Sequence, residues 1–325
     1  MRCRGELLTQ ALAPTTRVRY ERGLQEWIRF LKTYPKVYSL QFNLTLELFV
    51  TWRLRGGARP SSVYADLAAI RHQCAVLGRE YVPTEASLGI KALIKGGKRV
   101  YGGGVSKKAL PFKWLARFCR HLHSKHGNQR DVWLTIATLI VAFFGMLRVS
   151  EYAGKASEGD AVFTWNRVRI LETATAPASL TILRTKSKTN QVSSREETTA
   201  IHCTCSLELC AVHALKHFRH FCERTPGSAR VCAFNDGSPV QPWHVSNWVK
   251  ACAELAGGAR SDYSSHSLRS GGATHYFVNG VSLDDVAKLG RWAPGSTALR
   301  NSYLQATQQS AAGRAAAALQ SHGTL

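Results

Sequence analysis

A glycine-rich and basic segment, KGGKRVYGGGVSKK at residues 95–108, divides the chain into two parts of different character. It holds five glycines and five basic residues and shows no apolar periodicity, which is typical of a flexible linker. We therefore expect one domain at residues 1–95, a linker at 96–108 and a second domain at 109–325.

The part before the linker shows helical periodicity. In TTRVRYERGLQEWIRFLKTY, apolar residues recur at roughly helical spacing, namely Val18, Leu24, Trp27, Ile28 and Leu31. The segments LTLELFVTWRL, PSSVYADLAAIRHQCAVLG and SLGIKALIKG follow as further expected helices. The first domain is therefore predicted to be all-helical.

The part after the linker mixes helical and alternating patterns. LPFKWLARFCRHLHSKH, RDVWLTIATLIVAFFGMLRVSEY and LELCAVHALKHFRHFCER are helical in pattern, as is the region toward the C-terminus. DAVFTWNRVRI and SLTILRTKSKTN alternate as strands do. The longest apolar stretch, WLTIATLIVAFFGML, is too short to span a membrane and predicts a buried helix. We expect a mainly helical domain with a small sheet.

Net charge points to a polyanionic partner. The chain has 43 Lys and Arg against 21 Asp and Glu, a formal charge of +22. Residues 1–100 hold 17 basic and 7 acidic residues, which leaves +10 there and +12 in the remainder. Nucleic acid is the usual partner of such a chain, and an acidic protein is the alternative.

The cysteines indicate a reducing compartment. Nine is an odd number, and they are scattered along the chain, which argues against a disulfide framework. HCTCSLELCAVH offers four residues of zinc-ligand type, namely Cys203, Cys205, Cys210 and His213. Their C-x-C-x4-C-x2-H spacing departs from the common C-x2-C pairs, so we expect reduced cysteines here, with structural zinc as the alternative.

Two separated segments carry residues suited to phosphate chemistry. FFGMLRVSEYAG holds Arg148 after a predicted buried helix, and HSLRSGGATHYF holds His266 and Arg269 at positions i and i+3 of one helical face. A guanidinium offers a planar fork that matches phosphate oxygens. The alternative for Arg148 is an ion pair with Glu151, three residues further along a helix. The glycines after Arg269 fit close approach of another element.

The order and wording of these segments, with GRW and STALRNSYLQ after them, resemble the tyrosine recombinases of the phage-integrase type. The SKTNQ wording further resembles the recombinases of eukaryotic mobile elements of the Crypton-like and DIRS-like kinds. The resemblance implies a mainly α fold. It consists of an N-terminal helical core-binding (SAM-like) domain and a mainly helical catalytic domain with a small antiparallel sheet, the integrase-like catalytic core.

The resemblance also implies a catalytic set. Two arginines and a histidine hold the scissile phosphate, an indole N–H donates to it, a tyrosine is the nucleophile and a lysine is the general acid. In this sequence these are Arg148, Arg269, His266, Trp292, Tyr303 and Lys188, with Lys186 as the alternative lysine. The interval between Trp292 and Tyr303 is longer than the family pattern, so a loop insertion is expected there.

The implied activity is site-specific DNA recombination or integration through a 3′-phosphotyrosyl intermediate, serving a mobile element. Double-stranded DNA is the expected partner, with a homo-oligomer on DNA, a tetramer in synapsis. No metal, no other cofactor and no membrane are expected, and the location is intracellular, nuclear in a eukaryotic host. The alternatives are an inactive DNA-binding derivative, a type IB topoisomerase, and an RNA-binding or scaffold protein explained by charge alone.

Overall fold

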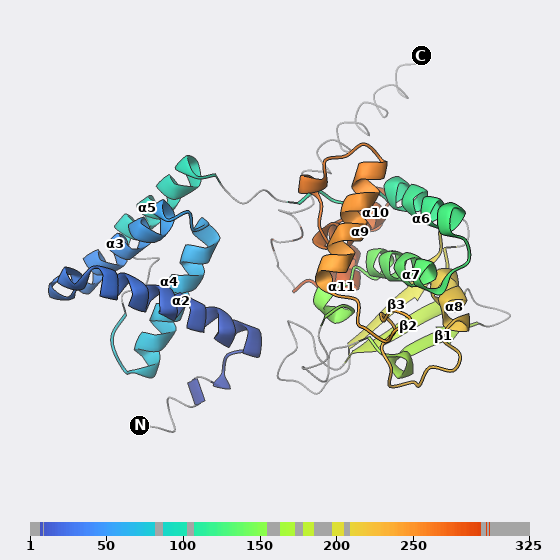
Figure 1. The fold of residues 1–325 in the computed structure, drawn as a ribbon, viewed down its shortest axis with the longest axis horizontal. Helices are drawn as coiled ribbons and strands as arrows, with labels where there is room; N and C mark the ends of the chain where they lie inside the picture. The colour runs from blue at the N-terminus through green and yellow to red at the C-terminus, as the bar shows by residue number, and fades with distance from the viewer. Residues whose placement is uncertain are drawn as a thin grey trace, which may run out of the picture. The chain divides into compact units, whose positions relative to one another are not determined.

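The computed structural model divides into two compact units, Met1–Val105 and Ser106–Leu325. Each is described by itself (Figure 1). The structure describes residues 7–8, 10–81, 87–102, 107–154, 163–172, 178–184, 197–204, 209–293, 297 and 299.

The first unit is helical throughout its described residues. Its elements are α2 (Pro14–Thr33), η1 (Pro35–Ser39), α3 (Phe42–Arg55), α4 (Pro60–Val76) and α5 (Leu88–Val100). Proline occupies the first turn of α2 and of α4, where its missing N–H has no intrahelical partner to lose. Helix α2 packs against α4, and α3 packs against α5.

Aromatic contacts form the core of this unit. The ring of Trp27 meets the rings of Phe30 and Phe49 with centroids 5.8 and 5.1 Å apart. Two residues expected on the apolar face of α2, Val18 and Ile28, are each 50% exposed instead. The buried side of α2 is set by Gly23, where a Cβ would lie 3.0 Å from the Asp66 Cα on α4.

The predicted linker begins too early. Helix α5 continues to Val100, inside the range 96–108. Gly97 is a packing position inside this helix, because a Cβ there would lie 2.8 Å from Cδ1 of Leu54 on α3. The neighbouring Gly96 meets nothing within 4 Å. One of the two glycines therefore serves helix packing rather than flexibility.

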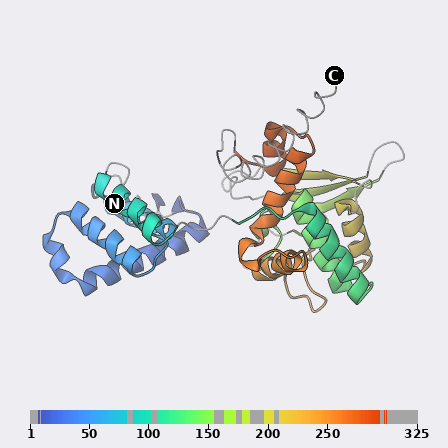
Figure 2. The same ribbon diagram turned by 90° about the horizontal axis from the view of Figure 1, so that it is seen from above.

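The second unit packs helices on a three-stranded sheet (Figure 1 and, from above, Figure 2). Its helices are α6 (Phe112–His126), α7 (Arg130–Phe144), α8 (Ala211–His220), α9 (Pro242–Leu255), α10 (His266–Val278) and α11 (Leu283–Gly290), with short turns η2 (Val149–Glu151), η4 (Trp165–Arg167) and η5 (Arg260–Asp262). The strands are β1 (Val168–Leu171), β2 (Ser179–Arg184) and β3 (Glu197–His202), in the order β1-β2-β3 with both pairs antiparallel.

Layers of helix follow one another outward from the sheet. Helix α8 packs on β2 and β3, α7 packs on α8, and α10 packs on α7. Leu180, Phe143 and Phe218, from β2, α7 and α8, are fully buried in the resulting core. The predicted fold class, mainly helical with a small antiparallel sheet, is confirmed.

Two elements differ from the sequence prediction. Strand β3, ETTAIH, is a partner of β2 that the sequence patterns did not indicate. Helix α7 ends at Phe144, although its periodicity predicts a helix up to residue 152. The chain turns at Gly145 and Met146, and Met146 has a φ of +45°, which a continuing right-handed helix does not permit.

Within the described part of the chain, no helix combines the length and the apolar character that crossing a bilayer requires.

Candidate active site

Arg148 follows the turn that ends α7. It precedes η2, and its backbone N–H and its guanidinium Nη1 donate to the two carboxylate oxygens of Glu151 at 2.9 and 3.2 Å. The ion pair weighed from the sequence is thus present. The Arg148 side chain remains 21% exposed while the Glu151 side chain is 5% exposed, so the carboxylate is interior and the guanidinium reaches the surface.

Arg269 lies in the first turns of α10 and is only 3% exposed. Its Nη1 donates to the carbonyl oxygen of Met146, and its Nη2 donates to the carbonyl oxygen of Gly290 at 2.6 Å. One guanidinium therefore joins the turn after α7 and the end of α11 to α10. Met146 is 123 positions and Gly290 is 21 positions from Arg269, so a distant and a nearby segment meet at this side chain.

His266 is the first residue of α10 and is exposed by surface area. Enough protein nevertheless surrounds it that desolvation lowers the pKa of its imidazole, and repulsion from Arg269 and then Arg148 lowers the pKa further. Both cations are therefore near this ring. The neutral imidazole is the favoured form near pH 7.

The glycines after Arg269 have the predicted packing role. A Cβ on Gly271 would lie 2.3 Å from the Leu110 carbonyl oxygen, and one on Gly272 would lie 2.0 Å from the Phe143 carbonyl oxygen. No side chain fits between α10 and these two backbone segments. Close approach of α10 to α7 is what brings His266 and Arg269 to the end of α7.

Trp292 follows α11 and is half-buried. Its ring lies under the Arg269 guanidinium, with the Cζ atom 4.0 Å from the ring centroid, and it packs beside Met146 and Val286. A Cβ on Gly290 would lie 1.6 Å from this ring, so the glycine permits the contact. The tryptophan is therefore a partly buried aromatic whose ring face stacks on a guanidinium, a favourable cation–π arrangement.

Arg291 is a site residue that the sequence reasoning missed. Its backbone is left-handed, with φ +59°, and its guanidinium donates to Glu151 Oε2 at 3.0 Å and to the hydroxyl of Thr199 on β3 at 2.9 Å. It also donates to the carbonyl oxygens of Gly145 and Met146. In the sequence it is one arginine among many, and no spacing marks it.

The remaining predicted site residues, Lys186, Lys188 and Tyr303, lie outside the described residues. The last residue of β2, Arg184, pairs with the first residue of β3, Glu197. The contact of Arg291 with Thr199 places β3 beside the arginine cluster.

The cluster of Arg148, His266, Arg269, Trp292 and Arg291 is made of cations, an imidazole and an N–H donor. Donors of this kind bind oxyanions, and fixed guanidiniums stabilise negative charge that grows on a phosphate during reaction. Glu151 keeps two of the arginines in place by accepting from both. The arrangement suits a phosphodiester.

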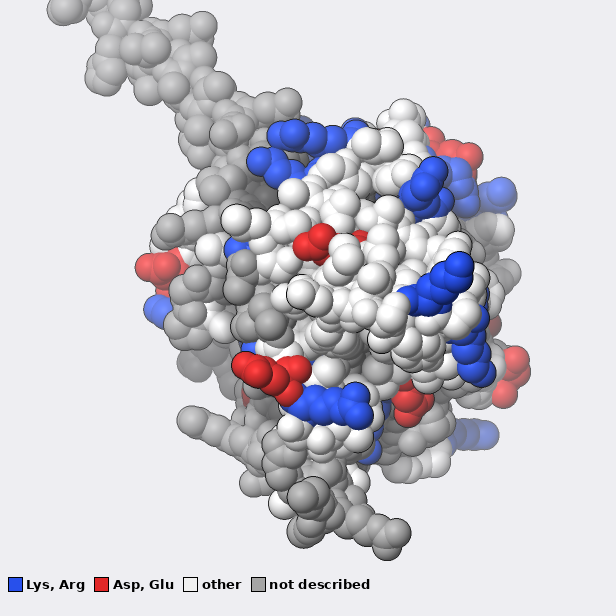
Figure 3. All heavy atoms as spheres, turned by 90° about the vertical axis from the view of Figure 1, so that its left-hand side faces the viewer, with Lys and Arg blue, Asp and Glu red and all other residues white. Residues whose placement is uncertain are grey.

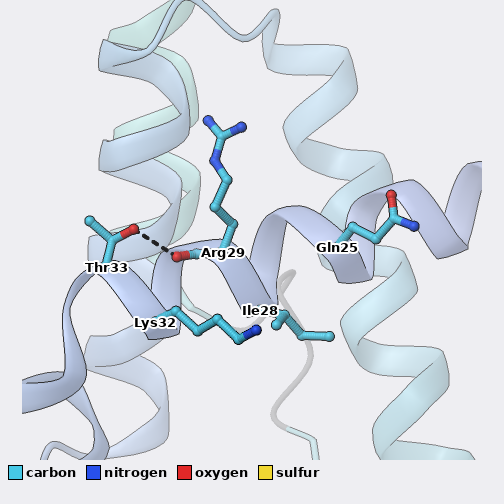
Figure 4. Close-up of a pocket in the computed structure, with 5 residues that line it drawn as sticks. All are labelled: Gln25, Ile28, Arg29, Lys32 and Thr33. Atoms are coloured by element: carbon cyan, nitrogen blue, oxygen red, sulfur yellow. Dashed lines mark hydrogen bonds between the residues drawn. The ribbon is translucent and has the colours of Figure 1, made fainter.

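The first unit carries a smaller basic surface. Helix α2 presents Arg29 and Lys32 in a shallow depression that Gln25, Ile28 and Thr33 also line, and the Thr33 hydroxyl donates to the Arg29 carbonyl oxygen at 2.8 Å (Figure 4). On the face drawn in Figure 3, lysine and arginine side chains lie mostly at the margin of a broad area of other residues, which has an acidic group near its centre.

The sequence matches no protein-family model and no curated protein. The XerH site-specific recombinase bound to palindromic difH substrate, in a post-cleavage complex, has a similar structure, with a TM-score of 0.61 at 15% identity over 92% of this chain and 78% of that chain. A Tn1549 transposon integrase variant in complex with transposon right end DNA gives 0.53 at 12% identity, over 92% and 93%. The chain therefore has the fold of tyrosine recombinases and integrases.

Proposed function

We propose that this protein is a site-specific DNA strand transferase that cleaves and rejoins DNA through a covalent tyrosine intermediate. The observation that carries the proposal is the meeting of Arg148, His266, Arg269 and Trp292 from three distant segments, within a fold shared with DNA-bound recombinases. The family pattern requires these residue types in this order.

The chemistry begins with attack of the Tyr303 oxygen on the phosphorus of one DNA strand. The phenol proton passes to His266, whose lowered pKa keeps the imidazole ready to accept it. The bond from phosphorus to the 5′ oxygen breaks, and Lys188, or Lys186 in its place, gives that oxygen a proton. The products are a 3′-phosphotyrosyl ester and a 5′-hydroxyl.

The arginines stabilise charge during this step. Arg148 and Arg269 bind the non-bridging oxygens of the phosphate, and the Trp292 N–H donates to the same group. A 5′-hydroxyl from a second duplex then attacks the phosphotyrosine and releases Tyr303. The ester conserves the energy of the phosphodiester, so the exchange needs no nucleotide cofactor.

DNA is the proposed partner of both units. Each half of the chain is strongly basic, and neutralised phosphates with released counterions provide affinity independent of sequence. By analogy with the family, four protomers assemble on two duplexes. A role in a mobile element of the Crypton-like or DIRS-like kind, and a nuclear location in a eukaryotic host, belong to the proposal through the SKTNQ wording, which lies outside the described residues.

One observation favours a second candidate, an inactive DNA-binding derivative of such an enzyme. Arg269 directs two of its guanidinium N–H groups to backbone carbonyl oxygens in this structure, where catalysis needs the side chain to engage a phosphate. In the active enzyme, the guanidinium has to contact DNA while keeping or exchanging these bonds.

Strand joining tests the proposal. The protein and an Arg148→Ala variant are mixed with a supercoiled plasmid and a pool of random duplexes, and joined molecules are sequenced. With the unaltered protein, we expect DNA junctions that all contain one core sequence. With Arg148→Ala, we expect no junctions. Relaxed plasmid without junctions would identify a topoisomerase instead, and salt-sensitive binding without either product would identify the inactive derivative.

A further inference from the structure

A second group of chemically capable side chains lies between strand β3 and helix α8, apart from the arginine cluster. Cys203 follows β3, and its backbone N–H donates to the Ala178 carbonyl oxygen at 2.7 Å, which extends the pairing with the β2 side of the sheet. Cys210 is the residue that caps the N-terminus of α8, and His213 is in the first turn of that helix. The fold thus brings the three residues together.

The distances within this group match a tetrahedral metal site. The Cys203 and Cys210 sulfurs are 3.6 Å apart, the Cys203 sulfur is 3.7 Å from His213 Nδ1, and all three ligand atoms lie within 4.8 Å of one another. Zinc bonds of about 2.3 Å to sulfur and about 2.0 Å to nitrogen, at tetrahedral angles, separate ligand atoms by roughly 3.5 to 3.8 Å. The Cys203 sulfur is therefore separated from both other ligand atoms by the distance that two ligands of one zinc ion show, and the third pair lies within 4.8 Å.

The surroundings supply support for a thiolate. The backbone N–H of Thr204 donates to the Cys210 sulfur at 3.4 Å, the kind of hydrogen bond that orients and stabilises a metal-bound sulfur. His213 is exposed, which gives an ion a path from solvent, while Cys210 is half-buried. A sequence spacing that differs from the common zinc pairs is compatible with the site because a strand end and a helix start, rather than one loop, provide the ligands.

We propose that Cys203, Cys210 and His213 bind a structural zinc ion that fastens the end of β3 to the start of α8. Two thiolates and one imidazole are soft and borderline ligands that select zinc over magnesium or calcium. Helix α8 covers the sheet, so the ion fixes a layer of the core, and it takes no part in the proposed strand transfer.

Cys203 is disulfide-bonded in this structure, so the expectation of reduced cysteines in this segment is wrong for Cys203. The zinc-bound state belongs to the reduced protein. A phosphine reductant supplies two electrons and becomes its oxide, and water supplies the oxygen and the two protons that convert the disulfide into two thiols. Zinc binding then releases the Cys203 and Cys210 protons to solvent, so affinity falls as pH falls.

Metal content of the full-length protein tests this site. The protein is purified in a phosphine reductant, equilibrated with zinc, freed of unbound ion and analysed by elemental mass spectrometry. We expect about one zinc per chain, with affinity at least about tenfold weaker in Cys210→Ser and in His213→Ala. His220→Ala is the matched control, since this exposed histidine lies at the other end of α8 and should leave zinc binding unchanged.

A second readout keeps the test decisive where a variant folds poorly. Cobalt replaces zinc in the unaltered protein, and sulfur-to-cobalt charge-transfer absorption reports thiolate ligands directly. We expect this absorption in the reduced protein and its loss after disulfide formation. Reduced protein that binds no zinc, or zinc binding that Cys210→Ser and His213→Ala leave unchanged, would overturn the proposal.

Discussion

Glu151 is a buried carboxylate that accepts hydrogen bonds from two arginines at once. Its side chain is 5% exposed and that of Arg291 is 12% exposed, so removal of Arg291 takes a cation away from an interior negative charge. We predict that Arg291→Ala lowers the free energy of unfolding by about 2 kcal/mol, because a buried hydrogen bond to a charged group is lost. Urea denaturation measures the change.

Two further variants separate the loss of the Arg291 side-chain contacts from backbone strain and from the loss of any surface ion pair. The free energy of unfolding of Arg291→Gly should be about 1 kcal/mol higher than that of Arg291→Ala, because glycine adopts the left-handed backbone at this position without strain. Lys288→Ala removes an exposed ion pair with Asp285 and should change stability by less than about 1 kcal/mol. Equal losses in Arg291→Ala and Lys288→Ala would contradict the structural role given to Arg291.

The pKa of His266 reports the cations around it. Desolvation, then Arg269, then Arg148 hold this pKa below its ordinary value near 6.5. Removing one cation removes repulsion, so Arg148→Ala should raise the pKa of His266, as followed by NMR titration of the imidazole protons. The pKa of His275, which burial alone lowers, is the internal control and should not move.

The same shift gives a pH dependence of stability. In the interval between the lowered pKa of folded His266 and about 6.5, the unfolded chain binds more protons than the folded one. The contribution of His266 is present above about pH 6.5 and is lost as pH falls through the folded pKa. His266→Gln should therefore have a shallower loss of stability in this interval than the unaltered protein, and an equal slope would contradict the lowered pKa.

At the scale of elements, glycines give opposite predictions at two helices. Gly272→Ala places a Cβ 2.0 Å from a backbone oxygen of α7, so α10 has to shift, at a cost of about 3 kcal/mol. Gly96→Ala in α5 meets nothing within 4 Å and should stabilise its helix by roughly 1 kcal/mol. Calorimetry should show a lower unfolding temperature for Gly272→Ala and a higher one for Gly96→Ala. An unchanged unfolding temperature in Gly272→Ala would contradict the close contact of α10 with α7.

Sequence patterns predicted most elements but not how they end or meet. The long periodic segments of α2, α7 and α10 were recognisable because burial of one face imposes the helical period. The end of α7 was not recognisable from the sequence. There the chain leaves the helix at Met146, whose φ is positive and whose carbonyl oxygen accepts from Arg269 and Arg291, residues more than a hundred positions away. Strand β3 was missed because its pairing with β2, rather than its own composition, defines it.

In the candidate site too, local spacing predicted some features, and contacts between distant segments set the others. The i, i+3 spacing of His266 and Arg269 predicted a shared face, and the glycines behind them predicted close packing. Arg291 depends on contacts with residues 140 and 92 positions away, which no local pattern encodes. The sequence marked Cys203, Cys210 and His213 as residues of zinc-ligand type, but only the packing of α8 on β3 shows that their ligand atoms converge.

For the whole molecule, charge predicts a strong dependence of DNA binding on salt. With a net charge of +22 shared between both halves, several phosphates should be neutralised per protomer. We expect affinity for duplex DNA to fall by roughly a thousandfold or more between about 50 and about 200 mM salt. Fluorescence anisotropy across this range measures the slope, and a slope near zero would argue against phosphate contacts as the source of affinity.

The covalent intermediate is the central claim, and trapping it is the most direct measurement. The protein and a Tyr303→Phe variant are incubated with nicked duplexes, which lose the leaving strand after cleavage, and are then separated under denaturing conditions. We predict a DNA-linked band for the protein alone, with the nucleotide attached to Tyr303 when the adduct is digested and mapped by mass spectrometry. An adduct that survives Tyr303→Phe, or no adduct from a protein that binds DNA, would contradict the account.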